Sequence, residues 1–128
     1  MNSPVSVPDE ERVTSIAKAI IDVDELISLL RKSTGQAKPW QRQLSSHLAT
    51  IDRTSQVLRM TITMDRDDGE VIAAIDELCL ACRGAAAAMA ATRADIGTRA
   101  ALTMLTDLAG VVRSTMHNEL AAADSLEA

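Results

Sequence analysis

The apolar residues of this chain recur at alternating spacings of three and four, from about residue 9 almost to the C-terminus. This heptad spacing places apolar side chains along one side of an α-helix, whereas a half-buried strand would alternate at every second residue. Three polar breaks, at residues 33–35, 65–69 and 95–98, divide the pattern into four blocks. The positions that we predict to face the interior are Val13, Ile16, Ile20, Val23, Ile27, Leu30, Leu44, Leu48, Ile51, Ser55, Leu58, Ile62, Ile72, Ile75, Cys79, Cys82, Ala86, Met89, Leu102, Leu105, Ala109, Val112 and Met116.

The residues at the ends of the blocks are typical of helix termini. Arg31 and Lys32 fall in the last turn of the first block, where positive charge complements the helix dipole. Pro39 stands at the start of the second block, a position at which its missing N–H is tolerated. Asp68 and Thr98 are the N-caps that we predict for the third and fourth helices.

Four amphipathic helices joined by short connections pack most simply with consecutive helices antiparallel. The sequence therefore predicts an all-α fold, an up-down-up-down antiparallel four-helix bundle. We assign residues 1–8 to a flexible N-terminal arm, residues 9–122 to the bundle and residues 123–128 to a frayed C-terminal tail.

The outward face of the third helix is unusually apolar. Arg83 is its only charged residue between residues 80 and 91. Since a helix that is apolar all round is normally buried on more than one side, we predict that the protein forms a homodimer through its third and fourth helices. A monomer that tolerates exposed alanines is the alternative, because alanine favours helices and adds little exposed area. The predicted interface residues are Leu80, Gly84, Ala87, Ala88, Ala91, Met104 and Val111.

Charge and composition narrow the classes of partner. The 13 basic residues are interspersed among 18 acidic ones, for a net charge of −5, whereas proteins that bind nucleic acid normally carry a basic stripe. No segment approaches the roughly 18–20 apolar residues of a membrane span, and the N-terminus does not resemble a secretory leader. We therefore predict a cytoplasmic protein that binds neither nucleic acid nor membrane.

Trp40 is the only aromatic residue, and two roles are open to it. It either closes one end of the bundle as a large apolar plug, or it is an exposed anchor for a protein partner, since tryptophan often dominates binding energy. We favour the plug, because a bundle without other aromatic side chains needs a large apolar group at its end.

Cys79 and Cys82 form a C-x-x-C pair in the middle of the third block. A redox pair would place its thiolate at a helix N-terminus, and a zinc site would need two further ligands, for which only His47 and His117 are present. We favour two small side chains in the core, which is a common environment for free cysteine. We predict no metal and no cofactor.

The spacing of Arg42 and His47, R-x4-H, is similar to that of the HEPN ribonucleases, which are dimeric helical bundles of comparable size. The resemblance implies cleavage of RNA, with His47 as general acid and base and Arg42 stabilising the phosphate charge. The acidic net charge argues against an RNA substrate. A four-helix bundle with a histidine on its second helix is also similar to a phosphotransfer domain. That family carries a Lys-Gly pair after its histidine, but Leu48 and Ala49 follow His47 here.

These patterns favour a non-enzymatic protein-interaction module, such as a regulator, adaptor, chaperone or inhibitor. We expect it to act as a homodimer, with one other protein as a further partner. The alternatives are a helical sensor that holds a small molecule in an apolar bundle interior, and a HEPN-like ribonuclease that uses Arg42 and His47.

Overall fold

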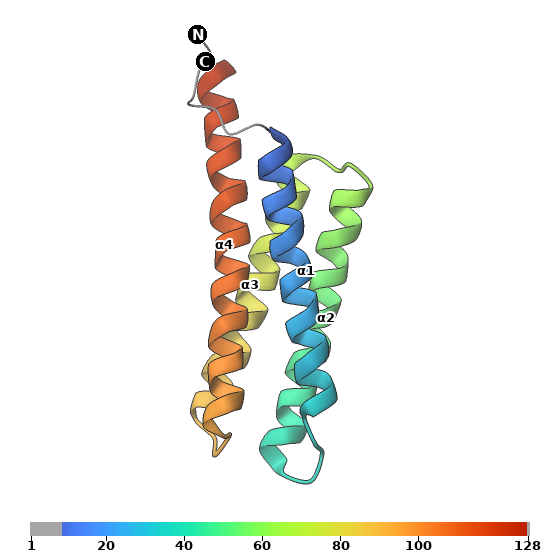
Figure 1. Cartoon of the computed structure of the whole chain (residues 1–128), viewed down its shortest axis with the longest axis vertical. Helices are drawn as coiled ribbons and strands as arrows, with labels where there is room; N and C mark the ends of the chain where they lie inside the picture. Colours follow the sequence, from blue (N-terminus) through green and yellow to red (C-terminus); the bar gives the residue numbers. More distant parts are fainter. Residues whose placement is uncertain (1–8, 128) are drawn as a thin grey trace.

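The computed structural model consists of four long α-helices (Figure 1). They are α1 (Asp9–Ser33), α2 (Pro39–Thr63), α3 (Asp68–Ala90) and α4 (Ile96–Glu127). The structure describes the backbone of residues 9–127 and the side chains of residues 16–118, and this part of the chain contains no strand. The predicted all-α fold with four helices is confirmed.

Each helix packs against two others. α1 contacts α2 and α4, and α3 contacts the same two helices, so the four contacts form a closed ring within the described residues. The connections after α1 and α3 lie at one end of the molecule, and the connection between α2 and α3 lies at the other (Figure 1). The helices therefore enclose a single interior along their length.

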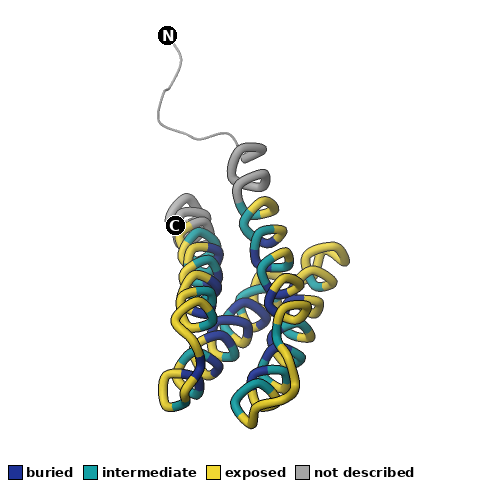
Figure 2. Tube along the Cα trace, turned by 60° about the horizontal axis from the view of Figure 1, so that its bottom comes forward, coloured by how far each residue is buried: buried dark blue, intermediate teal, exposed yellow. Residues whose placement is uncertain are grey.

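The buried positions follow the heptad pattern closely (Figure 2). Seventeen of the predicted positions, from Ile20 to Val112, have buried side chains, because each lies on the side of its helix that meets two neighbours. Ile62 departs from the prediction and is 38% exposed, since it lies in the last turn of α2. α3 also buries three residues that were not among the predicted interior positions, namely Ala74, Leu78 and Ala85.

The helix caps differ from the predicted ones by a few residues. The N-cap of α3 is Asp67, whose side chain accepts a hydrogen bond from the Glu70 amide at 2.8 Å. Asp95 takes this role for α4, since its carboxylate accepts from the amide of Thr98 at 2.7 Å. The predictions of Asp68 and Thr98 as caps are therefore wrong, because in each case an earlier aspartate is already placed to accept from the first turn.

At its C-terminal end, the helical part of the chain extends past the predicted limit of the bundle at residue 122. α4 continues to Glu127, so its helical backbone includes most of the segment 123–128 that we assigned to a tail. The predicted arm, residues 1–8, lies outside the described residues, as does residue 128. Among the described helices, none combines the length and the apolar character that a membrane crossing requires.

Candidate interaction surfaces

The outward face of α3 is built almost entirely from small side chains. Gly84, Ala87 and Ala91 are exposed, and Leu80 is 69% exposed. A Cβ added to Gly84 would meet nothing within 4 Å, so this part of the helix surface is open. Ala88 differs from the other predicted interface residues, because it is half-buried and packs against the core.

The structure does not bring Met104 to this face of α3. Met104 lines a groove together with Leu26, Leu29 and Leu108, and is therefore on the side of α4 that faces α1. Val111, which is 57% exposed, lines a shallow hollow with Arg83. The predicted patch thus consists of an α3 face of small residues and a separate α1–α4 groove of large ones.

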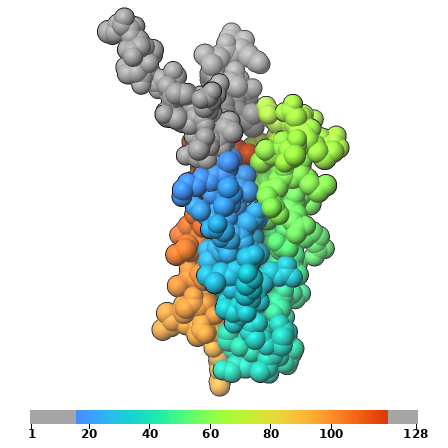
Figure 3. Space-filling view, turned by 45° about the vertical axis from the view of Figure 1, so that its right-hand side comes forward, coloured from blue at the N-terminus to red at the C-terminus, as the bar shows by residue number. Residues whose placement is uncertain are grey.

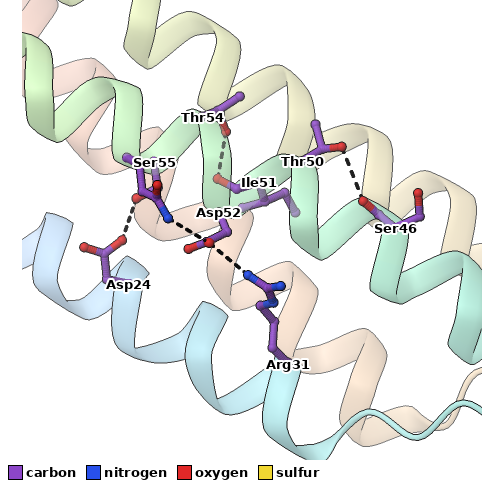
Figure 4. Close-up of polar contacts among 9 residues, drawn as sticks. Asp24, Arg31, Ser46, Thr50, Ile51, Asp52, Thr54 and Ser55 are labelled. Atoms are coloured by element: carbon purple, nitrogen blue, oxygen red, sulfur yellow. Dashed lines mark hydrogen bonds and ion pairs between the residues drawn. The ribbon is translucent and has the colours of Figure 1, made fainter.

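Polar side chains link α1 to α2, as Figure 4 shows. Ser55, which is fully buried, donates a hydrogen bond to Asp24 at 2.6 Å. The other oxygen of Asp24 lies 3.1 Å from Nε of Arg59. A serine at a heptad position is thereby satisfied by a carboxylate on the neighbouring helix, as a buried hydroxyl requires.

A second link between the same helices lies further along α1. Nη1 of Arg31 donates to Asp52 at 2.8 Å (Figure 4). The same oxygen of Asp52 accepts from the side-chain amide of Gln56 at 2.9 Å. Two aspartates, one on each helix, therefore hold α1 and α2 together by charge.

A comparable polar cluster links α3 to α4. Arg113 donates from Nε to Asp76 at 2.7 Å, and Nε2 of His117 lies 3.5 Å from the same carboxylate oxygen. The hydrogen bond from Arg113 is the main reason that the pKa of Asp76 lies below its ordinary value, and His117 lowers it further. Sequence reasoning missed this cluster, although the spacing of four between Arg113 and His117 places both on one side of α4.

Cys79 and Cys82 are both buried, as the core interpretation requires. The Cys79 thiol donates to the carbonyl of Ala109 at 3.4 Å. Burial raises the pKa of both thiols, that of Cys82 to about 12, so neither is ionised near neutral pH. Thiols in this state are poor nucleophiles and poor metal ligands.

Arg42 and His47 do not form a polar pair. Arg42 donates to the carbonyl oxygens of Gln36 and Ala37, at 2.8 and 3.2 Å, and so supports the connection between α1 and α2. His47 is half-buried, and no hydrogen bond or ion pair joins it to the described side chains. Five residues apart on a helix, the two side chains point about 140° away from each other.

Trp40 is half-buried and packs against the core in the first turn of α2. This contact favours the plug role over the exposed anchor. The fluorescence of the tryptophan, measured with and without a partner, distinguishes the two roles.

A hollow of about 470 Å³ opens at the end of the bundle where α2 joins α3. Its wall includes Ile20, Ile62, Val71 and Met116, and charged residues such as Arg66 stand at its edge. Pockets that hold small molecules have volumes of about 300–1,000 Å³ and mostly apolar walls.

Comparison of the chain with protein-family models, with curated proteins and with solved structures gave no match. Within the described residues, no group of three or more histidine, cysteine, aspartate or glutamate side chains is placed to hold a metal ion.

Proposed function

We propose that this protein is a non-enzymatic protein-interaction module, an up-down-up-down antiparallel four-helix bundle that acts as a homodimer. A regulator, adaptor, chaperone or inhibitor would work in this way. The closed ring of helix contacts and the alternating ends of the connections support the antiparallel topology.

The observation that carries the proposal is the α3 face. From Leu80 to Ala91 its exposed residues are small or apolar, and Arg83 is the only charge. Soluble proteins rarely leave a continuous apolar face open to water, and burying such a face against its own copy forms a closed two-fold assembly.

Small side chains also determine how the two copies would meet. Where glycine and alanine line a helix, a second helix can approach more closely than bulky side chains allow. Gly84 is the centre of the proposed contact, because a Cβ added there would meet no side chain and no other helix of its own chain within 4 Å. Any added volume at this position would therefore meet only the partner copy.

Sedimentation velocity at several protein concentrations tests the proposal. We expect the wild type to sediment as a dimer and Gly84→Glu to sediment as a monomer, because the glutamate adds both bulk and like charge at the two-fold contact. Ser46→Glu, at an exposed position on α2, is the matched control and leaves the dimer intact. A monomeric wild type at tens of micromolar, or a dimeric Gly84→Glu, contradicts the proposal.

Gly84→Ala sharpens the same test without adding a charge. In an isolated helix this change stabilises by about 0.5–1 kcal/mol, because alanine is the better helix former. At the proposed contact it should weaken the dimer, whereas Gly110→Ala, which also meets nothing within 4 Å, should not. Equal dimer dissociation constants for the two variants would show that Gly84 is not at the contact.

A second candidate function is the binding of a small apolar molecule. The hollow of about 470 Å³ beside Ile62 and Val71 favours it. A thermal-shift screen of small apolar compounds, repeated with Val71→Trp to fill the hollow, tests this candidate. A stabilising compound that no longer acts on the Val71→Trp variant would support it.

A further inference from the structure

The groove between α1 and α4 differs from the α3 face, because large apolar side chains form it. Leu26 and Leu108 are half-buried and pack against the core at its floor. Leu29 and Met104 stand at its edges, 61% and 56% exposed. Figure 3 looks onto α1 with α4 beside it on the left, so the two helices border one continuous side of the molecule.

Each side of the groove is an apolar edge of one helix. Met104 and Leu108, spaced by four residues, lie on the same side of α4. Leu26 and Leu29, spaced by three, form the corresponding edge of α1. Two apolar edges with a recess between them have the shape that receives the apolar face of a further helix.

The charges that line the groove are all negative. Asp22 and Glu25 border it, and no basic residue does. Lys18 lies 3.4 Å from Asp22, but both side chains are exposed, and such pairs are weak and easily exchanged. No ion pair joins Glu25 to another side chain among residues 16–118, so its carboxylate is available to an incoming cation.

We propose that the α1–α4 groove binds one amphipathic, basic helix of a partner protein. This inference rests on the proposed role as an interaction module but not on the homodimer. From Asp22 to Leu29 the groove covers about 10 Å of helix, or two turns. Two or three apolar anchors at helical spacing fill that length, with lysine or arginine beside them to meet Asp22 and Glu25.

A second copy of this chain fits the groove poorly. A two-fold contact would place Asp22 and Glu25 of one copy opposite the same residues of the other. Like charges held close together oppose association, whereas a basic helix gains attraction from the same carboxylates. The flexible side chain of Met104 also suits a partner whose anchors differ in shape.

Fluorescence anisotropy with a labelled synthetic peptide tests this inference. The probe is an amphipathic helix of about 18 residues, with leucines on one face and lysines on the other, and a second peptide carries glutamate in place of lysine. We expect the full-length protein to bind the lysine peptide and Leu29→Ser to weaken this binding about tenfold or more, as loss of a central anchor does. Glu25→Gln should weaken the binding and reduce its dependence on salt.

Matched controls localise the binding. Val57→Ser removes an exposed apolar side chain from α2, and Glu77→Gln removes an exposed carboxylate from α3, so neither should change the affinity. Circular dichroism shows whether each variant keeps the wild-type fold.

Several results would overturn the inference. They are a wild type that does not bind the lysine peptide, equal affinity for the lysine and glutamate peptides, and equal weakening by Leu29→Ser and Val57→Ser. A change in the sedimentation of the protein alone caused by Leu29→Ser would assign the groove to a second copy instead. The Gly84→Glu experiment reads out only the dimer, so failure of that proposal is distinguishable from failure of this one.

Discussion

The contacts within two helical pairs, α1 with α2 and α3 with α4, differ from the contacts between these pairs. α1 is joined to α2 by Asp24 and Asp52 with their donors, and α3 is joined to α4 by Asp76 with Arg113. Among residues 16–118, no side-chain hydrogen bond or ion pair joins α2 to α3 or α1 to α4, which meet through apolar side chains.

The apolar contacts and the polar contacts contribute to the fold in different ways. Burial of apolar side chains supplies most of the stability, but it is tolerant of small shifts of one helix along another. A carboxylate that accepts from a fixed donor is satisfied at only one register. We infer that the aspartates set the register within each helical pair, and that apolar packing then holds the two pairs together.

The largest expected effect belongs to the apolar contacts. Leu48→Ala removes a fully buried side chain of α2 and should lower the free energy of unfolding by about 2–5 kcal/mol. Urea denaturation followed by circular dichroism measures the change. Leu29→Ala, at an exposed position, is the control and should cost little. A small effect of Leu48→Ala would mean that apolar packing does not dominate the stability.

An intermediate effect is expected from the link between α1 and α2. Asp24→Ala leaves the buried hydroxyl of Ser55 without its acceptor and Arg59 without its partner, at a cost of about 1–3 kcal/mol. Asp22→Ala, which removes an exposed carboxylate from the same helix, should cost only a few tenths of a kcal/mol. A double-mutant cycle with Arg59→Ala isolates the coupling. A coupling energy near zero would contradict the role given to this pair.

The smallest effect is expected from Asp76 and depends on pH. The pKa of Asp76 is lower in the folded protein than its ordinary value of 3.8, chiefly because Arg113 donates to it. Its stabilising contribution is therefore present above that pH and is lost as the pH falls from 3.8 through the folded value. The side chain is exposed, so the loss should stay below about 1 kcal/mol.

The comparison of the wild type with Asp76→Asn isolates this contribution. The pKa of Asp95 is also lowered, by the hydroxyl and then the amide of Thr98, but this shift is present in both proteins. The difference in unfolding free energy between them, measured from pH 6 to pH 2.5, should shrink as the pH falls. A difference that is constant with pH would show that the Asp76 link does not stabilise the fold.

The apolar pattern was sufficient to predict the helices, their approximate limits and most of the core, because heptad spacing reports which side of a helix is buried. Ser55 was recognised at a core position, but its partner Asp24 was not, since the pattern does not state which residues of two helices face each other. The same reason accounts for the missed cluster around Asp76. It also explains why Met104 was wrongly grouped with the α3 face. The heptad phase places Met104 on the outer side of α4 but does not state which neighbouring helix it faces.

The central claim, that two copies meet through α3, is tested most directly by nuclear Overhauser effects between copies in a mixture of isotope-labelled and unlabelled protein. We expect contacts between copies from the methyl groups of Ala87, Ala91 and Leu80. Methyl groups of Leu29 and Met104, in the α1–α4 groove, should show none. The absence of any such contact at high concentration, or contacts from the groove methyls alone, would contradict the account.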